Sequence, residues 1–167
     1  MISGLFLTGT PAIDLTPDSF KAGFRPFPGI ELISKDHFTN EEALKFVSLL
    51  KPSYEAFMIE DAERAHGQAR SLMIAQALSG EGRSQKEIIE NTLVPLAFVL
   101  GTADEGINGE YIKSLLYKKE LQIHELPVDH DTFWSTSEAF NEAHSTPKCN
   151  ADKNRSVKED FLWCFII

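Results

Sequence analysis

Two residues whose side chains can share a proton, Asp104 and His130, each stand where a parallel strand is expected to end. Asp104 ends the run that begins at Pro95, and His130 follows the run that begins at Leu121. Groups at the carboxyl ends of neighbouring parallel strands gather at one edge of a sheet, so we expect these two side chains to meet. A carboxylate that orients an imidazole, which then acts as a general base, is the chemistry that such a pair supports.

The segments that must position this pair alternate between strands and helices along the chain. The sequence predicts strands at about 2–8, 95–103 and 121–126, and shorter helices at about 84–90, 108–116 and 135–143. This alternation predicts an α/β fold with a parallel sheet and right-handed crossovers.

A helical block of roughly 70 residues lies between the first two predicted strands and is too long for a single crossover helix. Residues 11–38 show no periodic pattern and predict an irregular segment. Thr39 and Glu42 have capping-box spacing and predict a helix that begins there, with Leu44 and Val47 on one face. Gly67 predicts a break between two later helices. We therefore expect a crossover helix together with a helical lid.

Composition limits the class of protein and the kinds of partner. The chain has 167 residues with 43% apolar and 25% charged residues, which is typical of one globular domain. Its net charge of −9 argues against a surface for nucleic acid or for an anionic membrane. The longest apolar run, residues 161–167, is too short to cross a bilayer. We see no signal peptide, and Cys149 and Cys164 lack zinc or redox spacing, which favours a reducing cytoplasm.

Three stretches in order resemble the C-terminal half of the α/β-hydrolase fold, and the resemblance covers residues 2–143. Residues 4–11 (GLFLTGTP) resemble the sixth strand of that family and the turn into its lid. Residues 100–104 (LGTAD) resemble the seventh strand with the acid of a catalytic triad. Residues 128–134 (VDHDTFW) resemble the histidine loop, with Asp129 where the family usually has glycine.

The resemblance implies a three-stranded parallel remnant of an α/β-hydrolase sheet in residues 1–144, with a lid at about 12–83 and a divergent tail at 145–167. It implies Asp104 as the triad acid, His130 as the base, no cofactor, and hydrolysis of an ester-like bond in a small molecule. A nucleophile elbow of the Gly-x-Ser-x-Gly type is not found. The nearest stretch, residues 82–86 around Ser84, lacks the last glycine and has no strand before it. We therefore expect the chain to be inactive alone.

Two other roles for the whole chain stay open. The first is a non-catalytic interaction module that associates through an exposed edge of the strand at 2–8, because unpaired edges bind other chains. The second is a partner-dependent hydrolase, in which a separate N-terminal half contributes the serine.

Other interpretations of single residues also stay open. Asp104 and His130 can instead be a turn residue and a loop residue, and Asp14 and Glu105 are alternative acids. A metal site at His124, Asp129, His130 and Asp131 is not expected, because strand alternation points His124 away from the loop. Aromatic residues of the lid and the histidine loop either line a substrate pocket or pack the lid on the core: Phe20, Phe24, Phe27, Phe38, Phe57, Phe133 and Trp134.

Overall fold

The computed structural model describes residues 4–51, 53–118, 121–145 and 161–165. Its centre is a parallel sheet with the strand order β3-β2-β1-β4. The strands are β1 (Gly4–Thr8), β2 (Leu96–Gly101), β3 (Leu121–Leu126) and β4 (Phe161–Phe165). The three strands that the sequence predicts are therefore present, in parallel pairs, and a fourth strand joins them.

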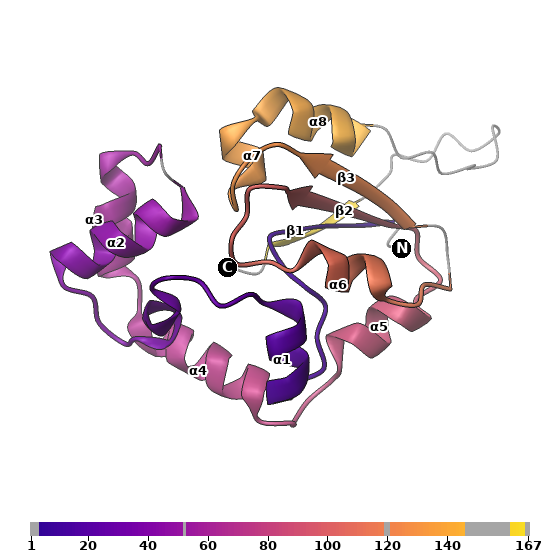
Figure 1. The fold of residues 1–167 in the computed structure, drawn as a ribbon, viewed down its shortest axis with the longest axis horizontal. Coiled ribbons are helices and arrows are strands. Elements are labelled where there is room, and N and C mark those ends of the chain that lie inside the picture. The colour runs from indigo at the N-terminus through magenta and orange to yellow at the C-terminus, as the bar shows by residue number, and fades with distance from the viewer. Residues whose placement is uncertain (1–3, 52, 119–120, 146–160, 166–167) are drawn as a thin grey trace.

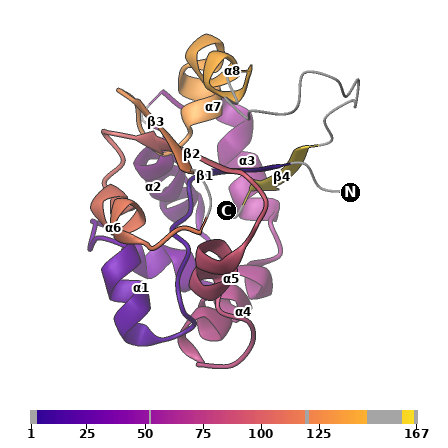
Figure 2. The ribbon, with the colours of Figure 1, turned by 90° about the vertical axis from the view of Figure 1, so that its right-hand side faces the viewer.

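Helices cover both faces of the sheet, which is why β1 and β2 are apolar at almost every position. Helix α5 (Gln85–Asn91) and helix α6 (Gly109–Ser114) lie below the sheet in Figures 1 and 2, and α7 (Thr132–Ser135) and α8 (Ser137–Ser145) lie above it. One core cluster includes Leu7, Phe98, Leu100, Ile89 and Ile112. The other contains Phe6, Val99, Phe140 and Ala143. Successive residues of β1 and β2 thus pack alternately into the two clusters.

The helical segment that the sequence predicts as a lid, called the lid here only as a name for these helices, lies on the side of the sheet where the strands end (Figure 1). It consists of α1 (Pro17–Gly23), the 3-10 helix η1 (Ile30–Ser34), α2 (Asn40–Leu50), α3 (Ala56–Arg64) and α4 (Gly67–Leu78). The segments that precede and follow these helices are bound together, because the amides of Gln85 and Lys86 both donate to the carbonyl of Ile13. Asp14 accepts a hydrogen bond from Ser84 and lies 3.9 Å from the Lys86 ammonium.

Local sequence signals explain where several lid helices begin. The capping box predicted at Thr39 and Glu42 is present at the start of α2. Gly67 begins α4 at a point where a Cβ atom would overlap the carbonyl group of Asp36. Of the residues placed on one face of α2, Val47 is buried and Leu44 is 37% exposed, and Ala43 is buried as well.

The segment at 11–38 is less irregular than the sequence pattern predicts. It contains α1 and η1. The signal for α1 is local: the Thr16 side chain accepts from the amide of Ser19, and Pro17 occupies the first turn.

The largest departure from expectation is at the β1 edge of the sheet. The sequence identifies residues 145–167 only as a divergent tail, and the alternative interpretation as an interaction module depends on an exposed β1 edge. Instead, β4 pairs with β1 from Gly4↔Phe161 to Thr8↔Phe165, so the prediction of an exposed edge is wrong. The intervening residues 146–160 lie outside the described part of the chain. Among the described residues, no helix is long and apolar enough to cross a membrane.

Candidate functional site

The structure brings Asp104 and His130 together at the ends of adjacent strands. Asp104 follows β2, His130 follows β3, and His130 Nδ1 lies 2.8 Å from Asp104 Oδ2. The Asp104 side chain is only 6% exposed and that of His130 is 23% exposed. Asp104 Oδ1 accepts from the amides of Gly106 and Ile107 at 2.8 and 3.1 Å. One carboxylate oxygen thus fixes the acid in its loop, and the other orients the imidazole.

Backbone contacts hold the start of the histidine loop, residues 128–134, directly against the end of β2. The amide of Thr102 donates to the carbonyl of Leu126 at 2.8 Å, and that of Ala103 donates to the carbonyl of Val128 at 3.0 Å. A Cβ atom on Gly101 would lie 2.2 Å from the carbonyl oxygen of Asp129. Glycine at 101 is therefore what allows the loop to cross the strand at this distance.

Asp129, which replaces the usual glycine of the family pattern, fits the loop without strain. No described residue other than glycine has a positive φ, so position 129 does not need the left-handed conformation that favours glycine. Asp129 Oδ1 accepts a hydrogen bond of 2.7 Å from the Ser135 hydroxyl. The substitution adds a bond across α7.

A buried pair of threonine hydroxyls joins the histidine loop to β1. Thr8 Oγ1 and Thr132 Oγ1 lie 2.8 Å apart, and Thr132 is 1% exposed. The contact ties the start of α7, two residues after His130, to the end of the central strand. Sequence reasoning did not single out either threonine, because nothing in the local pattern links residues so far apart in the chain.

The free nitrogen of the imidazole faces a small hollow. Gly9, at a φ of 65°, lies beside it, and a Cβ atom there would be 3.3 Å from His130 Nε2. The hollow is lined by Gly9, Val99, Leu100, Gly101, Asp104, Ile107, Gly109 and His130. Among the described residues, Asp104 is the side chain that hydrogen-bonds to the imidazole, through Nδ1. Nε2 is therefore positioned to accept a proton from a group that reaches the hollow.

The charges of the pair stabilise each other. Burial raises the pKa of Asp104, but the hydrogen bond and the charge of His130, with the two loop amides, outweigh it and hold that pKa below its ordinary value. Burial lowers the pKa of His130, but the hydrogen bond and charge of Asp104, with the nearby Asp131 and Asp129, leave that pKa raised. The carboxylate thus stabilises the imidazolium, and the imidazolium stabilises the carboxylate.

Asp131 is a further charged group of the histidine loop. Burial raises its pKa, and the neighbouring Asp129 raises it further, while His130 and Lys51 act in the opposite direction. Lys51 comes from the lid, so the lid contributes a positive charge near the histidine loop.

The alternative acids and the alternative nucleophile are placed elsewhere or in other roles. Ser84 caps α5, where it accepts from the Glu87 amide, and it donates to Asp14. Asp14 is thus engaged where the lid joins the core, and Glu105 is exposed. Among the described residues, Asp104 and not Asp14 or Glu105 hydrogen-bonds to the imidazole of His130.

The metal site that the sequence did not favour is not formed by the described residues, where no three His, Cys, Asp or Glu side chains cluster suitably. His124 lies on β3 in register with Val99. Its Nε2 is buried and has no hydrogen-bond partner among the described residues.

The aromatic residues of the lid divide into two groups. Phe20 stacks on Phe24 with ring centroids 4.5 Å apart, and Phe24 also packs against the core cluster that contains Leu7 and Phe98. Phe38 lies 5.1 Å from Phe46 within the lid. Phe57 of α3 instead lies 6.0 Å from Trp134 of α7. This last contact joins the lid to the helix that follows His130.

Comparison with solved structures shows the same architecture in known hydrolases. The chain superposes on the N-acyl homoserine lactonase AidH, solved with N-butanoyl homoserine, with a TM-score of 0.79 and 22% identity over 86% of this chain and 53% of that one. A hydrolase from Pseudomonas aeruginosa PA01 gives a TM-score of 0.52 at 18% identity, over 86% and 54% of the two chains. An esterase from Rhodococcus sp. ECU1013 gives 0.50 at 16% identity, over 86% and 56%. No family model and no curated protein matches the sequence.

These similarities identify the fold of the chain as part of the α/β-hydrolase fold, as the sequence resemblance implies. The chain spans about half the length of the structures it matches. At these identities the similarity establishes the fold alone, and the activity must be argued from the site.

Proposed function

We propose that Asp104 and His130 are the acid and the base of a hydrolase that cleaves an ester-like bond in a small molecule. The observation that carries this proposal is the 2.8 Å contact between His130 Nδ1 and a carboxylate whose other oxygen is held by two amides. The arrangement fixes one tautomer and leaves Nε2 towards the hollow, as a general base requires. The lactonase and esterase activities of the structural neighbours support the reaction class.

The nucleophile in this proposal is a serine from a part of the fold outside this chain. An elbow serine would donate its proton to His130 Nε2 as its oxygen attacks the carbonyl carbon, and the imidazolium would then protonate the leaving group. Water would hydrolyse the acyl intermediate with His130 again as the base. The serine comes either from the same polypeptide, if its transcript is longer, or from a separate N-terminal half. We place this reaction in the cytoplasm, as the cysteine usage favours.

The test begins with the transcript that encodes this chain, read through both ends. If an in-frame upstream segment encodes a Gly-x-Ser-x-Gly elbow, the longer protein is expressed and assayed against p-nitrophenyl esters and acyl lactones. We expect hydrolysis that falls by about 10³-fold or more in His130→Ala and in the elbow Ser→Ala variant. A longer protein whose hydrolysis is unchanged in His130→Ala would refute the assignment.

If the transcript holds no such segment, the present chain is assayed alone and after mixing with a separately encoded half that carries the elbow. Activity on mixing that disappears in His130→Ala supports the partner-dependent reaction. Absence of activity in both assays rejects catalysis and leaves a non-catalytic role.

A further inference from the structure

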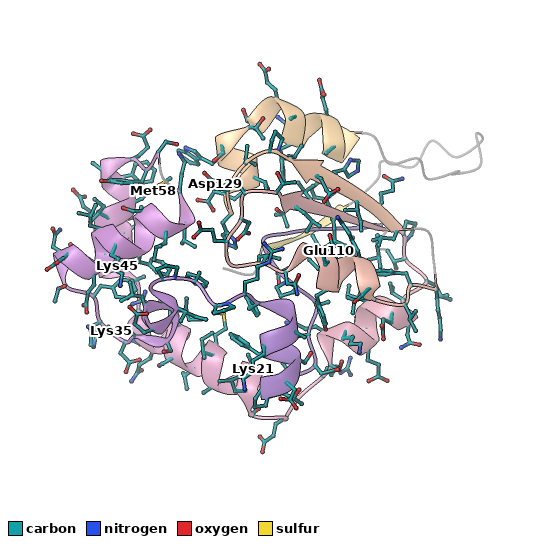
Figure 3. The ribbon with its side chains drawn as sticks, in the orientation of Figure 1. Lys21, Lys35, Lys45, Met58, Glu110 and Asp129 are labelled. Atoms are coloured by element: carbon teal, nitrogen blue, oxygen red, sulfur yellow. The ribbon has the colours of Figure 1, made fainter. Side chains whose placement is uncertain are left out.

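The lid reaches the histidine segment through the indole of Trp134. Phe57 of α3 packs beside the ring, with centroids 6.0 Å apart and planes inclined at 52°. Lys51, at the C-terminal end of α2, places its ammonium 5.9 Å from the centroid of the same ring. Side chains from the end of α2 and from α3 therefore both contact Trp134 of α7. Figure 3 labels Met58 on α3 and Asp129 on the histidine loop, which lie on opposite sides of this contact between the lid and α7.

Lys51 is an unusual residue for such a position, because it is 4% exposed. Buried lysines normally have a carboxylate partner. Here the ammonium donates to the carbonyl and, at 2.9 Å, to the hydroxyl of Ser53, and no carboxylate of the described residues forms an ion pair with it. The ammonium also lies over the Trp134 ring, and its charge lowers the pKa of Asp131.

Trp134 and His130 belong to one short, tightly bonded segment. The amide of Thr132 donates to the carbonyl of His130, and the amide of Trp134 donates to the carbonyl of Asp131, both at 3.0 Å. The Thr8 hydroxyl anchors Thr132 to β1. The two residues are therefore joined by a hydrogen-bonded stretch of about one helical turn.

We propose that Lys51, Phe57 and Trp134 form a latch, in which the two lid side chains hold the indole and thereby position the imidazole of His130. These three are positioning residues that act through His130 and do not touch the reacting atoms. Trp134 and Phe57 are 46% and 48% exposed, so opening the latch does not require taking apart a closed core. This inference rests on the proposed function only for its effect on turnover, because the latch contact itself is independent of chemistry.

The first measurement uses Trp134 as its own reporter. The chain has two tryptophans, so Trp163→Phe gives a parent with Trp134 alone. Lys51→Met keeps the length of the side chain and removes the charge, and Phe57→Ala removes the ring. We expect both variants to shift the emission of Trp134 to the red and to raise its acrylamide quenching about two-fold. Lys51→Arg preserves the cation over the ring and is expected to retain the parent signal.

The matched control is Lys45→Met. Lys45 belongs to the same helix, is half-exposed and pairs with Glu31 at 2.9 Å, away from Trp134. Its loss is expected to leave the quenching unchanged. Circular dichroism of each variant separates opening of the latch from loss of the fold, and a Phe57→Leu variant provides a milder change if Phe57→Ala unfolds.

The second measurement follows the imidazole by nitrogen NMR in the same proteins. We expect Lys51→Met and Phe57→Ala to move the His130 resonances and Lys45→Met to leave them in place. Quenching and imidazole signals at the parent values in both latch variants would overturn the latch, whatever the protein hydrolyses. If the latch holds and an active assembly is obtained, kcat is expected to fall more than KM rises. A latch seen by fluorescence in a protein that hydrolyses nothing would instead reject the proposed function and keep the structural inference.

Discussion

The two carboxylate oxygens of Asp104 have different tasks, and this division sets the chemistry of the site at the scale of single residues. Oδ1 is held by the amides of Gly106 and Ile107, and Oδ2 bonds to the imidazole. The acid therefore cannot rotate away without breaking loop hydrogen bonds. It orients His130 and raises its pKa at the same time.

The Asp104→Asn substitution is expected to lower the pKa of His130, because it removes the negative charge that stabilises the imidazolium. Titration of the imidazole by NMR measures this pKa without any assay of activity. Glu105→Gln is the control, since Glu105 is the adjacent, exposed carboxylate and does not bond to the imidazole. If the pKa of His130 changed in Glu105→Gln and stayed constant in Asp104→Asn, the assignment of Asp104 as the acid that acts on His130 would be wrong.

The same pair makes stability depend on pH in a defined direction. The folded pKa of His130 is raised above its ordinary 6.5, so its contribution is complete below that value and is lost as the pH rises through the folded pKa. The folded pKa of Asp104 is below its ordinary 3.8, so its contribution is complete above 3.8 and is lost as the pH falls through the folded value. The pair therefore contributes fully between these two ordinary values.

Urea unfolding across this range tests the linkage. We expect the difference in unfolding free energy between the natural chain and His130→Ala to be largest in the mildly acidic window, and to shrink as the pH rises past the folded pKa of His130. A difference that grows with increasing pH would mean that the imidazole is stabilised in its neutral form. If the protein hydrolyses esters with His130 as the base, the rate is expected to rise over the same range in which stability falls.

At the scale of elements, the crossing of the histidine loop over β2 sets the position of His130. Gly101→Ala is expected to destabilise the fold by about 1–3 kcal/mol, because its Cβ would lie 2.2 Å from a backbone oxygen that belongs to the loop. The matched control is Gly109→Ala at the start of α6, where a Cβ atom would meet Leu100 at an ordinary 3.5 Å.

Thermal and urea unfolding of the two alanine variants measure the difference. Gly109→Ala is expected to be neutral or to stabilise by up to about 1 kcal/mol, because alanine favours helix. Equal effects at the two positions would mean that the loop can shift away from β2 at little cost.

The elements that the sequence predicts are those with a local signature. Strands β1 and β2 are nearly continuous apolar runs, β3 has Leu121, Ile123 and Leu126 among polar residues, and α2 begins at a capping box. Asp104 and His130 could be found because the ends of parallel strands converge, so two local predictions place them at one edge. Helix α7 has four residues and no periodicity, so the sequence predicted only the later helix α8.

The contacts that escape prediction join segments far apart in the chain. The hydroxyls of Thr8 and Thr132 are 124 residues apart in sequence, and no local pattern relates them. Lys51 and Trp134 likewise belong to separate patterns, one of a lid helix and one of a loop. Strand β4 belongs to the stretch at 145–167 that the sequence identifies only as a divergent tail, because pairing at a sheet edge depends on which strand the fold leaves unpaired.

At the scale of the whole molecule, the two edges of the sheet decide how this part of the fold meets other chains. Strand order places β3 at one edge and β4 at the other, so β1 is interior only because β4 pairs with it. Any further strand of an α/β-hydrolase sheet must join at β4, displace it, or join at β3. Whether β4 stays paired with β1 or is displaced therefore affects whether a separate half of the fold can bind at this edge.

Deletion of residues 146–167 is expected to expose the whole of β1 and to cause self-association, because an apolar unpaired edge strand binds other strands. Light scattering after size-exclusion chromatography measures the mass of the deletion variant and of the full chain over a range of concentrations. A deletion variant that stays monomeric at every concentration would show that β1 does not need β4 as a cover.

Two single substitutions distinguish hydrogen-bonded pairing of β4 with β1 from simple steric cover of β1 by β4. Along an edge strand, alternate residues direct their amides to the neighbouring strand, so only one of the adjacent residues Leu162 and Trp163 donates to β1. Proline removes that donor, and Leu162→Pro and Trp163→Pro are therefore expected to differ, one associating like the deletion variant and the other like the full chain. If the two variants associated equally, β4 would prevent self-association by covering β1 sterically and not by hydrogen-bonded pairing. A difference between them would establish the parallel β1–β4 ladder in solution and make displacement of β4 the step that a complementing half of the fold must achieve at this edge.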